Sequence, residues 1–218
     1  MATPTVPVYD YSHAEPSLSA YTSMMLELYF RNLAKFSVAE VLDVGPVCNE
    51  NIICFAKRVK RFYVCDLFLR FSRKRRKGLV FQKVLDYLDY TPGCFDGINL
   101  WDFIDHLKDD DISRLVSRCR ALLAPGGMMS VTSFEKQWAP AKTHSFVIKD
   151  GYQITFRLQD HLDLPRYYHS NRILTAALSE FQTVKSFIYR NGVREFLCKN
   201  DWGTSPFKRD CPLNQSSD

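Results

Sequence analysis

Residues 41–51 read VLDVGPVCNEN and decide how the rest of this chain is interpreted. The apolar start is typical of a buried strand, which ends at Asp43 and a turn that contains Gly45. A helix-like run follows, and then a second apolar strand that ends at Asp66. A strand, a glycine turn, a helix and a second strand tipped by an acid form the plan of a nucleotide-cofactor site. The sequence therefore predicts such a site where the first two strands end.

The length and composition of the chain favour one well-packed α/β domain. Its 218 residues are 46% hydrophobic, which is enough to bury a substantial core without a second lobe. Prolines at positions 4, 7 and 16 make the first eighteen residues a poor helix. We therefore expect a flexible arm over residues 1–18, one domain over 19–199 and a flexible tail over 200–218.

Apolar patterns predict strands that alternate with helices. Residues 21–33 have helical spacing, with Ser17 or Ser19 as the N-cap. Further strands are expected at 38–44, 62–65, 79–82, 95–101 and 128–134, and further helices at 50–59, 110–123 and 171–181, the last capped by Asn171. After a long irregular stretch, strands at 184–189 and 193–198 flank Asn191-Gly192, a strong hairpin signal. The pattern predicts a mostly parallel sheet, covered on both faces, that ends in an antiparallel pair.

Cysteine usage and hydropathy restrict the expected compartment. The seven cysteines fall at irregular spacings with no Cys-x-x-Cys pair, which argues against a zinc site or a disulfide framework and for a reducing cytosol. The first ten residues lack the charged and apolar regions of a signal peptide, and no window is long enough to span a bilayer. We therefore expect a cytoplasmic protein without a membrane partner.

Five segments share their order and spacing with a known family. They are VLDVGP at 41–46, Asp66 after the second strand, FD at 95–96, WDFIDHL at 101–107 and LLAPGG at 122–127. Together they resemble the class I S-adenosylmethionine-dependent methyltransferases over about residues 37–199. The resemblance implies a Rossmann-like, seven-stranded, mostly parallel sheet with an antiparallel C-terminal hairpin and helices on both faces. It also implies that cofactor and substrate bind at the carboxyl ends of the strands.

The resemblance assigns the first two strand ends to S-adenosyl-L-methionine. Asp43 and Gly45, with Pro46 in the same turn, would form the floor beneath the methionine part of the cofactor. Asp66 would accept hydrogen bonds from the two ribose hydroxyls, which suits a carboxylate because it offers several lone pairs to a diol.

The remaining implied contacts come from later in the chain. Leu67 would lie against the adenine, Asp86 with Leu85 or Tyr87 would meet the edge and amino group of the adenine, and Trp101 would border the sulfonium. Judged singly, Asp43 could equally cap a turn and Trp101 could equally belong to the core. Their joint placement favours the cofactor pocket.

Two residues depart from the family's turn, which usually carries two more glycines where this chain has Val47 and Asn49. A β-branched residue in the left-handed conformation costs about 1–2 kcal/mol, whereas asparagine tolerates that conformation better. If the turn keeps its shape, cofactor binding is weakened or lost; if it follows another path, Cys48 and Asn49 supply other contacts. Two functions therefore stay open: a methyltransferase for a small molecule, and a catalytically inactive methyltransferase-like binding or scaffold protein.

The sequence after the fourth strand favours a small-molecule acceptor. Relatives that methylate amides of nucleic acid or protein often carry Asn/Asp-Pro-Pro-Tyr/Phe there, whereas residues 99–102 read NLWD. Methyl transfer needs mainly alignment, so the catalytic residues stay unknown. His106 is a candidate base or an ordinary histidine at a helix start. Residues 135–171 hold several aromatic residues and histidines, among them His144 and His169, and form either an acceptor pocket or a lid that packs on the sheet edge.

A basic stretch runs from Lys57 to Lys77 and is opposed only by Asp66, although the net charge of the whole chain is a modest +5. It is either a solvated helix face or a site for phosphate, nucleic acid or another acidic partner. A nucleic-acid-associated protein is thus a third interpretation.

Overall fold

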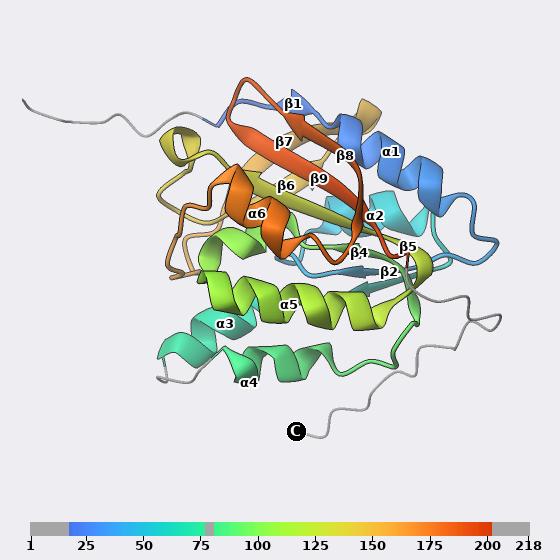
Figure 1. Ribbon diagram of the computed structural model, residues 1–218. Helices are drawn as coiled ribbons and strands as arrows, with labels where there is room; N and C mark the ends of the chain where they lie inside the picture. The colour runs from blue at the N-terminus through green and yellow to red at the C-terminus, as the bar shows by residue number, and fades with distance from the viewer. Residues whose placement is uncertain (1–17, 77–80, 202–218) are drawn as a thin grey trace, which may run out of the picture.

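The computed structural model describes residues 18–76 and 81–201, and these form a three-layer α/β fold (Figure 1). The described main sheet has six strands in the order β3-β2-β4-β5-β9-β8, and a smaller antiparallel sheet has the order β1-β7-β6. In the main sheet β3, β2, β4 and β5 are parallel, whereas β9 runs antiparallel to both of its neighbours. The chain passes from β2 to one side and then returns to the other, so the strand order reverses between β2 and β4, where folds of this kind bind ligands.

The described elements have the following bounds. The strands are β1 (Tyr21–Thr22), β2 (Glu40–Asp43), β3 (Arg61–Val64), β4 (Phe95–Asn99), β5 (Leu123–Phe134), β6 (His144–Ile148), β7 (Gln153–Leu158), β8 (Gln182–Ile188) and β9 (Val193–Lys199). The α-helices are α1 (Met24–Leu33), α2 (Asn49–Ala56), α3 (Leu67–Arg76), α4 (Gln82–Leu85), α5 (Asp109–Leu122) and α6 (Asn171–Ala177). Short 3-10 helices span Asp86–Leu88, Trp101–His106, Lys136–Trp138 and Asp150–Tyr152.

Alternate residues of each central strand pack into opposite layers. On β2, Leu42 belongs to the core shared with α3, α4, α5 and α6, whereas Val41 belongs to the core shared with α1, α2 and the β6–β7 hairpin. On β9, Phe196 and Leu197 divide in the same way. This follows from the two-residue period of a strand, and it buries β2 and β4 along their whole length. The predicted α/β class, with helices on both faces and an antiparallel C-terminal hairpin, is confirmed.

The helix caps differ from the expected ones by a few residues. Helix α1 is capped by Ser23, whose side chain accepts a hydrogen bond from the backbone N–H of Leu26 at 2.9 Å. Ser19 is therefore not the cap, and Ser17 lies outside the described residues. Helix α6 is capped by Ser170 rather than Asn171. Both caps satisfy a backbone donor that the helix leaves free, which is worth about 1 kcal/mol.

Two segments differ from the predicted elements. Of the strand expected at 79–82, the first two residues lie outside the described ones, and Gln82 begins α4 instead. The stretch expected to be irregular contains the β6–β7 hairpin, in which Phe146 pairs with Phe156. The sequence carried a signal for this hairpin, because Asp150-Gly151 separates two apolar runs, and Gly151 indeed has a φ of 64°.

The described residues include both free and disulfide-bonded cysteines. Cys48, Cys54, Cys65, Cys119 and Cys198 are free thiols, whereas Cys94 is disulfide-bonded, so the expectation of reduced cysteines does not hold throughout. The described residues contain no group of three or more His, Cys, Asp or Glu side chains that could hold a metal ion. No helix between residues 18 and 76 or between 81 and 201 is long and apolar enough to cross a membrane.

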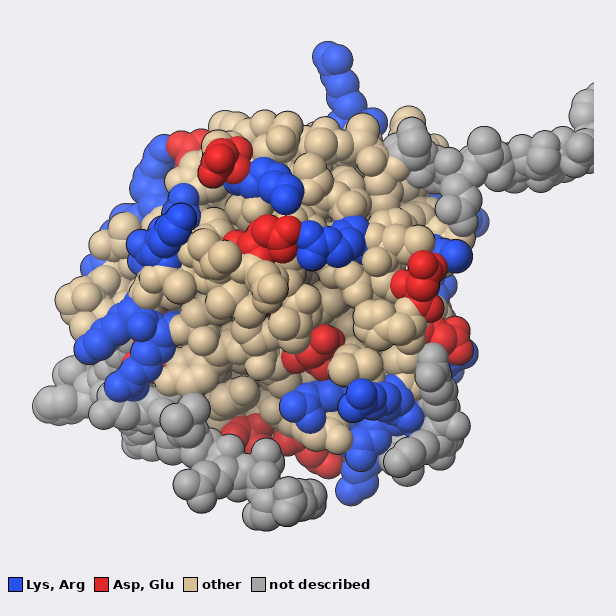
Figure 2. Space-filling view, turned by 180° about the vertical axis from the view of Figure 1, so that it is seen from behind, with Lys and Arg blue, Asp and Glu red and all other residues tan. Residues whose placement is uncertain are grey.

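Several members of the basic stretch make contacts within the protein. The guanidinium of Arg58 lies 4.9 Å from the ring centre of Phe30, and that of Arg70 lies 4.0 Å from the ring centre of Tyr87. Lys77 and the residues after it, up to position 80, lie outside the described part. On the face that Figure 2 shows, Lys and Arg are interspersed with Asp and Glu rather than gathered into one continuous patch. A nucleic-acid or other acidic partner for this stretch stays a prediction.

Candidate functional site

The switch point of the sheet brings three of the predicted cofactor residues into contact. Asp43 ends β2, Gly45 lies in the turn after it, and Trp101 begins the 3-10 helix that follows β4. Because Asp43 is paired with Asn99 in the parallel register, the two strand ends lie side by side. The local reason is the sequence pattern itself: apolar strands stop where the first polar residues and the glycine begin.

The indole of Trp101 lies directly on Gly45. Its Nε1 donates a 2.6 Å hydrogen bond to Oδ1 of Asp43, and both side chains are buried. A Cβ added to Gly45 would lie 2.3 Å from Cδ1 of Trp101, closer than real Cβ atoms come to any neighbour. Gly45 is thus the residue that leaves room for the indole. The surface that the sequence assigned to the methionine part of the cofactor is covered by a side chain of the protein.

The backbone of Trp101 is strained, and packing holds it in place. Its φ is +43°, a left-handed conformation that costs a bulky residue about 1–3 kcal/mol and persists only when its surroundings enforce it. Phe146 of β6 stacks on the indole, with 5.5 Å between ring centres and 18° between planes. The hairpin is fastened to α2 by Asn51, whose side chain donates to the carbonyl of Phe146 at 2.8 Å and accepts from the N–H of Ile148 at 2.9 Å. We call the pair Trp101 and Phe146 the indole cover.

Burial raises the pKa of Asp43 to about 7, and hydrogen bonds from Trp101 and Asn99 oppose that rise. The physical cause is the loss of water around a charge: a carboxyl that is 2% exposed is harder to ionise. The carboxyl that accepts the hydrogen bond of the indole therefore has a pKa near neutral pH.

Asp66, the predicted ribose acceptor, is engaged with the backbone around it. Its Oδ1 accepts from the N–H of Leu69 at 2.8 Å, and its Oδ2 accepts from the N–H of Val47 at 3.4 Å. Burial raises its pKa. The first bond caps the start of α3, while the longer second bond leaves Oδ2 with capacity for another donor.

Val47 and Asn49, the two departures from the glycine pattern, do not fill the site. Val47 is 58% exposed, and Trp101 and Tyr152 are the only described residues other than glycine with positive φ, so Val47 is not in the left-handed conformation. Asn49 is the first residue of α2, with Cys48 as its N-cap. The turn therefore follows a path that valine adopts without strain.

The residues expected around the adenine differ in their burial and contacts. Leu67 is fully buried in the core beneath the sheet. Asp86 has a side chain that is 57% exposed, lies 3.9 Å from Lys83 and lines a groove between α4 and α5. Tyr87 packs against Arg70, and its backbone carbonyl lies 3.6 Å from Sγ of Cys65, the residue that follows β3. Pro46 is buried beside Gly45. The structure thus gathers Asp43, Gly45, Pro46, Asp66 and Trp101 at the strand ends, and the contacts of Leu67, Asp86 and Tyr87 with the adenine stay predictions.

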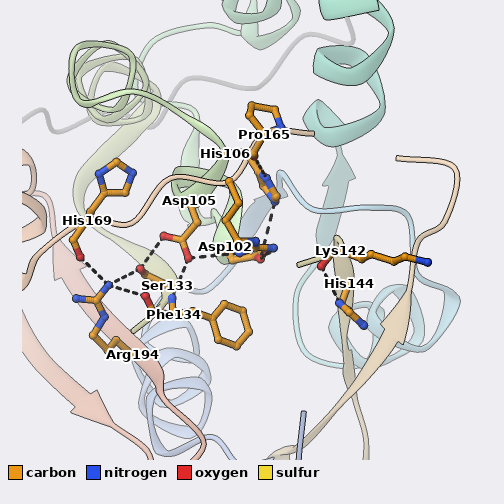
Figure 3. Close-up of polar contacts among 11 residues, drawn as sticks. Asp102, Asp105, His106, Ser133, Phe134, Lys142, His144, Pro165, His169 and Arg194 are labelled. Carbon is orange, nitrogen blue, oxygen red and sulfur yellow. Dashed lines mark hydrogen bonds and ion pairs between the residues drawn. The ribbon is translucent and has the colours of Figure 1, made fainter. Parts of the chain in front are cut away.

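A buried polar cluster lies beyond Trp101, where β4 and β5 end (Figure 3). Asp105 accepts from the hydroxyl of Ser133 at 2.7 Å and from the N–H of Phe134 at 2.8 Å, and burial raises its pKa to about 7, with Asp102 adding to the rise. Arg166, from the stretch predicted to determine the acceptor, lies 3.2 Å from Asp102 and is 6% exposed.

Several polar atoms of this cluster have no hydrogen-bond partner among the described residues. They are Oδ1 of Asp102, Nε2 of His106, Nε and Nη1 of Arg166, Nε2 of His169 and Nε of Arg194. Buried polar groups of this kind are uncommon, because each one costs free energy. Sequence reasoning missed Arg166, because a single arginine in a loop gives no periodic signal.

The three candidate histidines occupy different surroundings. Nδ1 of His106 lies 2.6 Å from the carbonyl of Pro165 and must carry the proton, because a carbonyl only accepts. Burial lowers the pKa of His106 to about 4. His169 contacts Asp109 at 3.0 Å, and Figure 3 shows His144 apart from the cluster, beside the carbonyl of Lys142.

Comparison with known proteins shows the fold. No protein-family model and no curated protein sequence matches the chain. Solved structures do match, among them an S-adenosylmethionine-dependent methyltransferase from Clostridium acetobutylicum (TM-score 0.53, 11% identity, 80% of this chain and 88% of that one). DesVI from Streptomyces venezuelae has a TM-score of 0.51, 14% identity and coverage of 80% and 89%. The N-methyltransferase NodS from Bradyrhizobium japonicum, in complex with S-adenosyl-L-homocysteine, has a TM-score of 0.50, 15% identity and coverage of 81% and 85%. The chain therefore has the fold of class I S-adenosylmethionine-dependent methyltransferases.

Proposed function

We propose that this protein binds S-adenosyl-L-methionine at the strand ends of β2 and β3 and transfers its methyl group to a small polar molecule. The observation that carries the proposal is the convergence of Asp43, Gly45 and Asp66 at the switch point of a sheet with the methyltransferase fold. Structures that match this fold include proteins named as methyltransferases and one in complex with S-adenosyl-L-homocysteine.

The two halves of the cofactor fit this conformation differently. Asp66 lies at the end of β3 with capacity for a ribose hydroxyl. The glycine surface at Gly45, however, holds the indole of Trp101, so the methionine half does not fit while the indole cover is closed. When bound, the cofactor would supply an activated methyl group; the contribution of the protein is to orient it and to exclude water.

The polar cluster beyond Trp101 is where we place the acceptor. Oδ1 of Asp102 is a buried acceptor and Nε of Arg166 is a buried donor, and neither has a hydrogen-bond partner among the described residues. Nη1 of Arg166 also lacks a hydrogen bond there, although it lies 3.7 Å from Oδ2 of Asp105. A small molecule with both N–H or O–H donors and oxygen acceptors would complement them. His106 is not assigned as the base, because its low pKa and its bond to Pro165 fit a structural role.

A second candidate is a methyltransferase-like binding protein without turnover. The closed indole cover favours it, because a side chain of the protein occupies the surface on which a methyl donor would be held. Binding of S-adenosyl-L-methionine without its conversion to S-adenosyl-L-homocysteine, in the presence of any offered amine, hydroxyl or carboxylate acceptor, would favour this candidate.

Thermal unfolding in increasing S-adenosyl-L-homocysteine tests the proposed binding. A ligand that binds only the native state raises the midpoint of unfolding, by an amount that grows with its concentration. Asp66→Asn should weaken this effect about tenfold or more, because the amide keeps an oxygen for Leu69 but lacks the charge that favours the ribose diol.

Asp201→Asn is the matched control, because Asp201 pairs with Lys199 at the opposite edge of the main sheet, where Lys199 lies beside Met128 near the start of β5. It should leave the effect of the ligand unchanged. The proposal fails if neither the wild-type protein nor variants lacking the Trp101 indole are stabilised at millimolar ligand.

A further inference from the structure

The surface of Gly45 can be occupied by one group at a time. A Cβ built on Gly45 would lie 2.3 Å from Cδ1 and 2.8 Å from Nε1 of Trp101, so the indole already fills that space. A ligand that lies on the glycine therefore requires the indole to leave. We infer that Trp101 is an internal competitor for the methionine half of the cofactor site and sets the affinity of that site; this inference rests on the proposed function.

The contacts of the indole define what a competing ligand must supply. The indole offers one hydrogen-bond donor, Nε1, and it is used on Oδ1 of Asp43. Removing it leaves a buried carboxyl without that donor, which is costly unless the incoming ligand brings an N–H group. A ligand with an ammonium group meets this need, and a purely apolar one does not.

The contacts of the Trp101 side chain and the strain in its backbone have opposite effects on the closed position of the indole. Stacking with Phe146 and the bond to Asp43 favour the closed position. The backbone of Trp101, with φ at +43°, disfavours it. A strained residue kept in place by a few contacts is the arrangement that allows two positions of similar free energy. Opening would relieve the backbone while it exposes the ring.

The adenosine half of the site shares no described hydrogen bond with the indole cover. Asp66 bonds to Leu69 and Val47, and neither of these residues contacts the indole in the described hydrogen bonds. Ligands that carry only adenosine chemistry should therefore be insensitive to Trp101. Ligands that also carry an amino-acid end should be penalised by it.

Two ligands distinguish the methionine half of the site from the adenosine half. S-adenosyl-L-homocysteine carries the amino-acid end, and 5′-methylthioadenosine lacks it. Binding of each to the wild-type protein, Trp101→Ala and Trp101→Phe is measured by calorimetry. If the closed cover leaves about one molecule in ten competent, Trp101→Ala should bind S-adenosyl-L-homocysteine about tenfold more tightly than wild type, while its affinity for 5′-methylthioadenosine changes less than threefold. Trp101→Phe supplies a smaller aromatic ring without Nε1, and its affinity for S-adenosyl-L-homocysteine should lie between those of wild type and Trp101→Ala.

Tryptophan fluorescence tests the inference in a protein that keeps Trp101, so the result does not depend on whether the Trp101 variants fold. Replacing Trp138 and Trp202 with Phe leaves Trp101 as the only fluorophore of its kind among the three tryptophans of the chain. S-adenosyl-L-homocysteine should shift its emission to longer wavelength as the indole leaves its stack, and 5′-methylthioadenosine should not.

The possible results distinguish failure of the internal competitor from failure of the proposed function. If S-adenosyl-L-homocysteine binds the wild-type protein and Trp101→Ala equally, with no change in emission, the internal competitor is refuted and the proposed function stands. If neither ligand binds any variant, the proposed function fails and the inference fails with it.

Discussion

Trp101 donates its indole N–H to Oδ1 of Asp43 at 2.6 Å, and this bond joins the ends of two neighbouring parallel strands across the switch point of the sheet. The two residues are 58 positions apart in the chain. A bond of this length to a buried carboxyl makes the state of Asp43 and the position of Trp101 interdependent. Several measurable consequences arise from it and from its surroundings.

Restoring glycines to the turn should not improve cofactor binding. In the double variant Val47→Gly, Asn49→Gly, the affinity for S-adenosyl-L-homocysteine should change less than threefold, because Val47 is exposed and has no positive φ to relieve. Each added glycine should instead lower the free energy of unfolding by about 0.4–1 kcal/mol, through the greater freedom of the unfolded chain. Calorimetry and chemical denaturation measure the two effects. A tenfold gain in affinity would show that the turn, and not the indole, limits binding.

The free energy of unfolding should fall as the pH rises from about 4 to about 7, in part through Asp43. Burial raises the pKa of this carboxyl to about 7 in the folded protein, so between these pH values the unfolded chain releases a proton that the folded protein keeps. The stabilisation is complete below the unfolded pKa and is lost as the pH passes the folded one. A rise of about three pKa units corresponds to at most about 4 kcal/mol.

Asp43→Asn isolates this contribution. The free energy of unfolding of wild type minus that of the variant, measured in urea, should fall steadily from pH 4 to pH 7, because the amide does not titrate. The buried Asp105, whose pKa shifts in the same direction, stays present in both proteins and cancels. A difference that is independent of pH would contradict the assignment.

His106 should matter for stability rather than for binding. Its ring is 1% exposed, packs against Phe68 with 5.4 Å between ring centres and donates to the carbonyl of Pro165. His106→Ala removes this packing and leaves the carbonyl unpaired, so we expect a loss of about 2–4 kcal/mol in the free energy of unfolding. His144→Ala, at a partly exposed ring, should cost less than about 1 kcal/mol. Unaltered stability of His106→Ala, combined with lost binding, would restore His106 as a residue of the site.

Asn51 should control how firmly the hairpin closes over the indole. Asn51→Ala removes the hydrogen bonds that join α2 to Phe146 and Ile148. Amide hydrogen exchange over residues 144–158 should become faster by about tenfold or more, because each lost bond is worth about 1 kcal/mol. Glu27→Ala, which breaks an exposed pair with Arg31 on α1, is the control and should leave the hairpin unchanged. Equal protection in both variants would mean that packing alone holds the hairpin.

Glu195 should be a large contributor to stability, because it fastens the start of the described chain to its end. Its buried carboxylate accepts from the hydroxyls of Tyr21, Ser23 and Tyr189 at 2.7–2.9 Å. Glu195→Gln turns one acceptor oxygen into a donor that faces hydroxyls, and we expect a loss of about 2–4 kcal/mol. Tyr189→Phe removes one of these bonds and also the hydroxyl that accepts from the N–H of Met24 at 2.9 Å, and should cost about 1–2 kcal/mol. Denaturant unfolding of the two variants gives the comparison, and a smaller loss for Glu195→Gln than for Tyr189→Phe would contradict this role.

The sequence by itself determined the layered fold and the places where polar residues meet. Strand periodicity, the glycine turn after Asp43 and the Asn191-Gly192 hairpin are local signals, and each is read within a few residues. Because parallel strands end at one edge, the convergence of Asp43, Gly45 and Asp66 was predictable from order alone. The β6–β7 hairpin was also present as an Asp-Gly turn, and only its weak flanking pattern concealed it.

The tertiary structure alone decided what occupies the site. The sequence placed the obstacle to cofactor binding at Val47 and Asn49, where glycines are missing, whereas the folded chain turns Val47 to solvent and places Trp101 on Gly45. Which side chain fills a given space depends on rotamers, strand register and packing from Phe146, and these join residues far apart in the chain. Local sequence patterns do not predict such contacts, because a tryptophan after a strand gives the same pattern whether it borders a ligand or occupies the ligand's position.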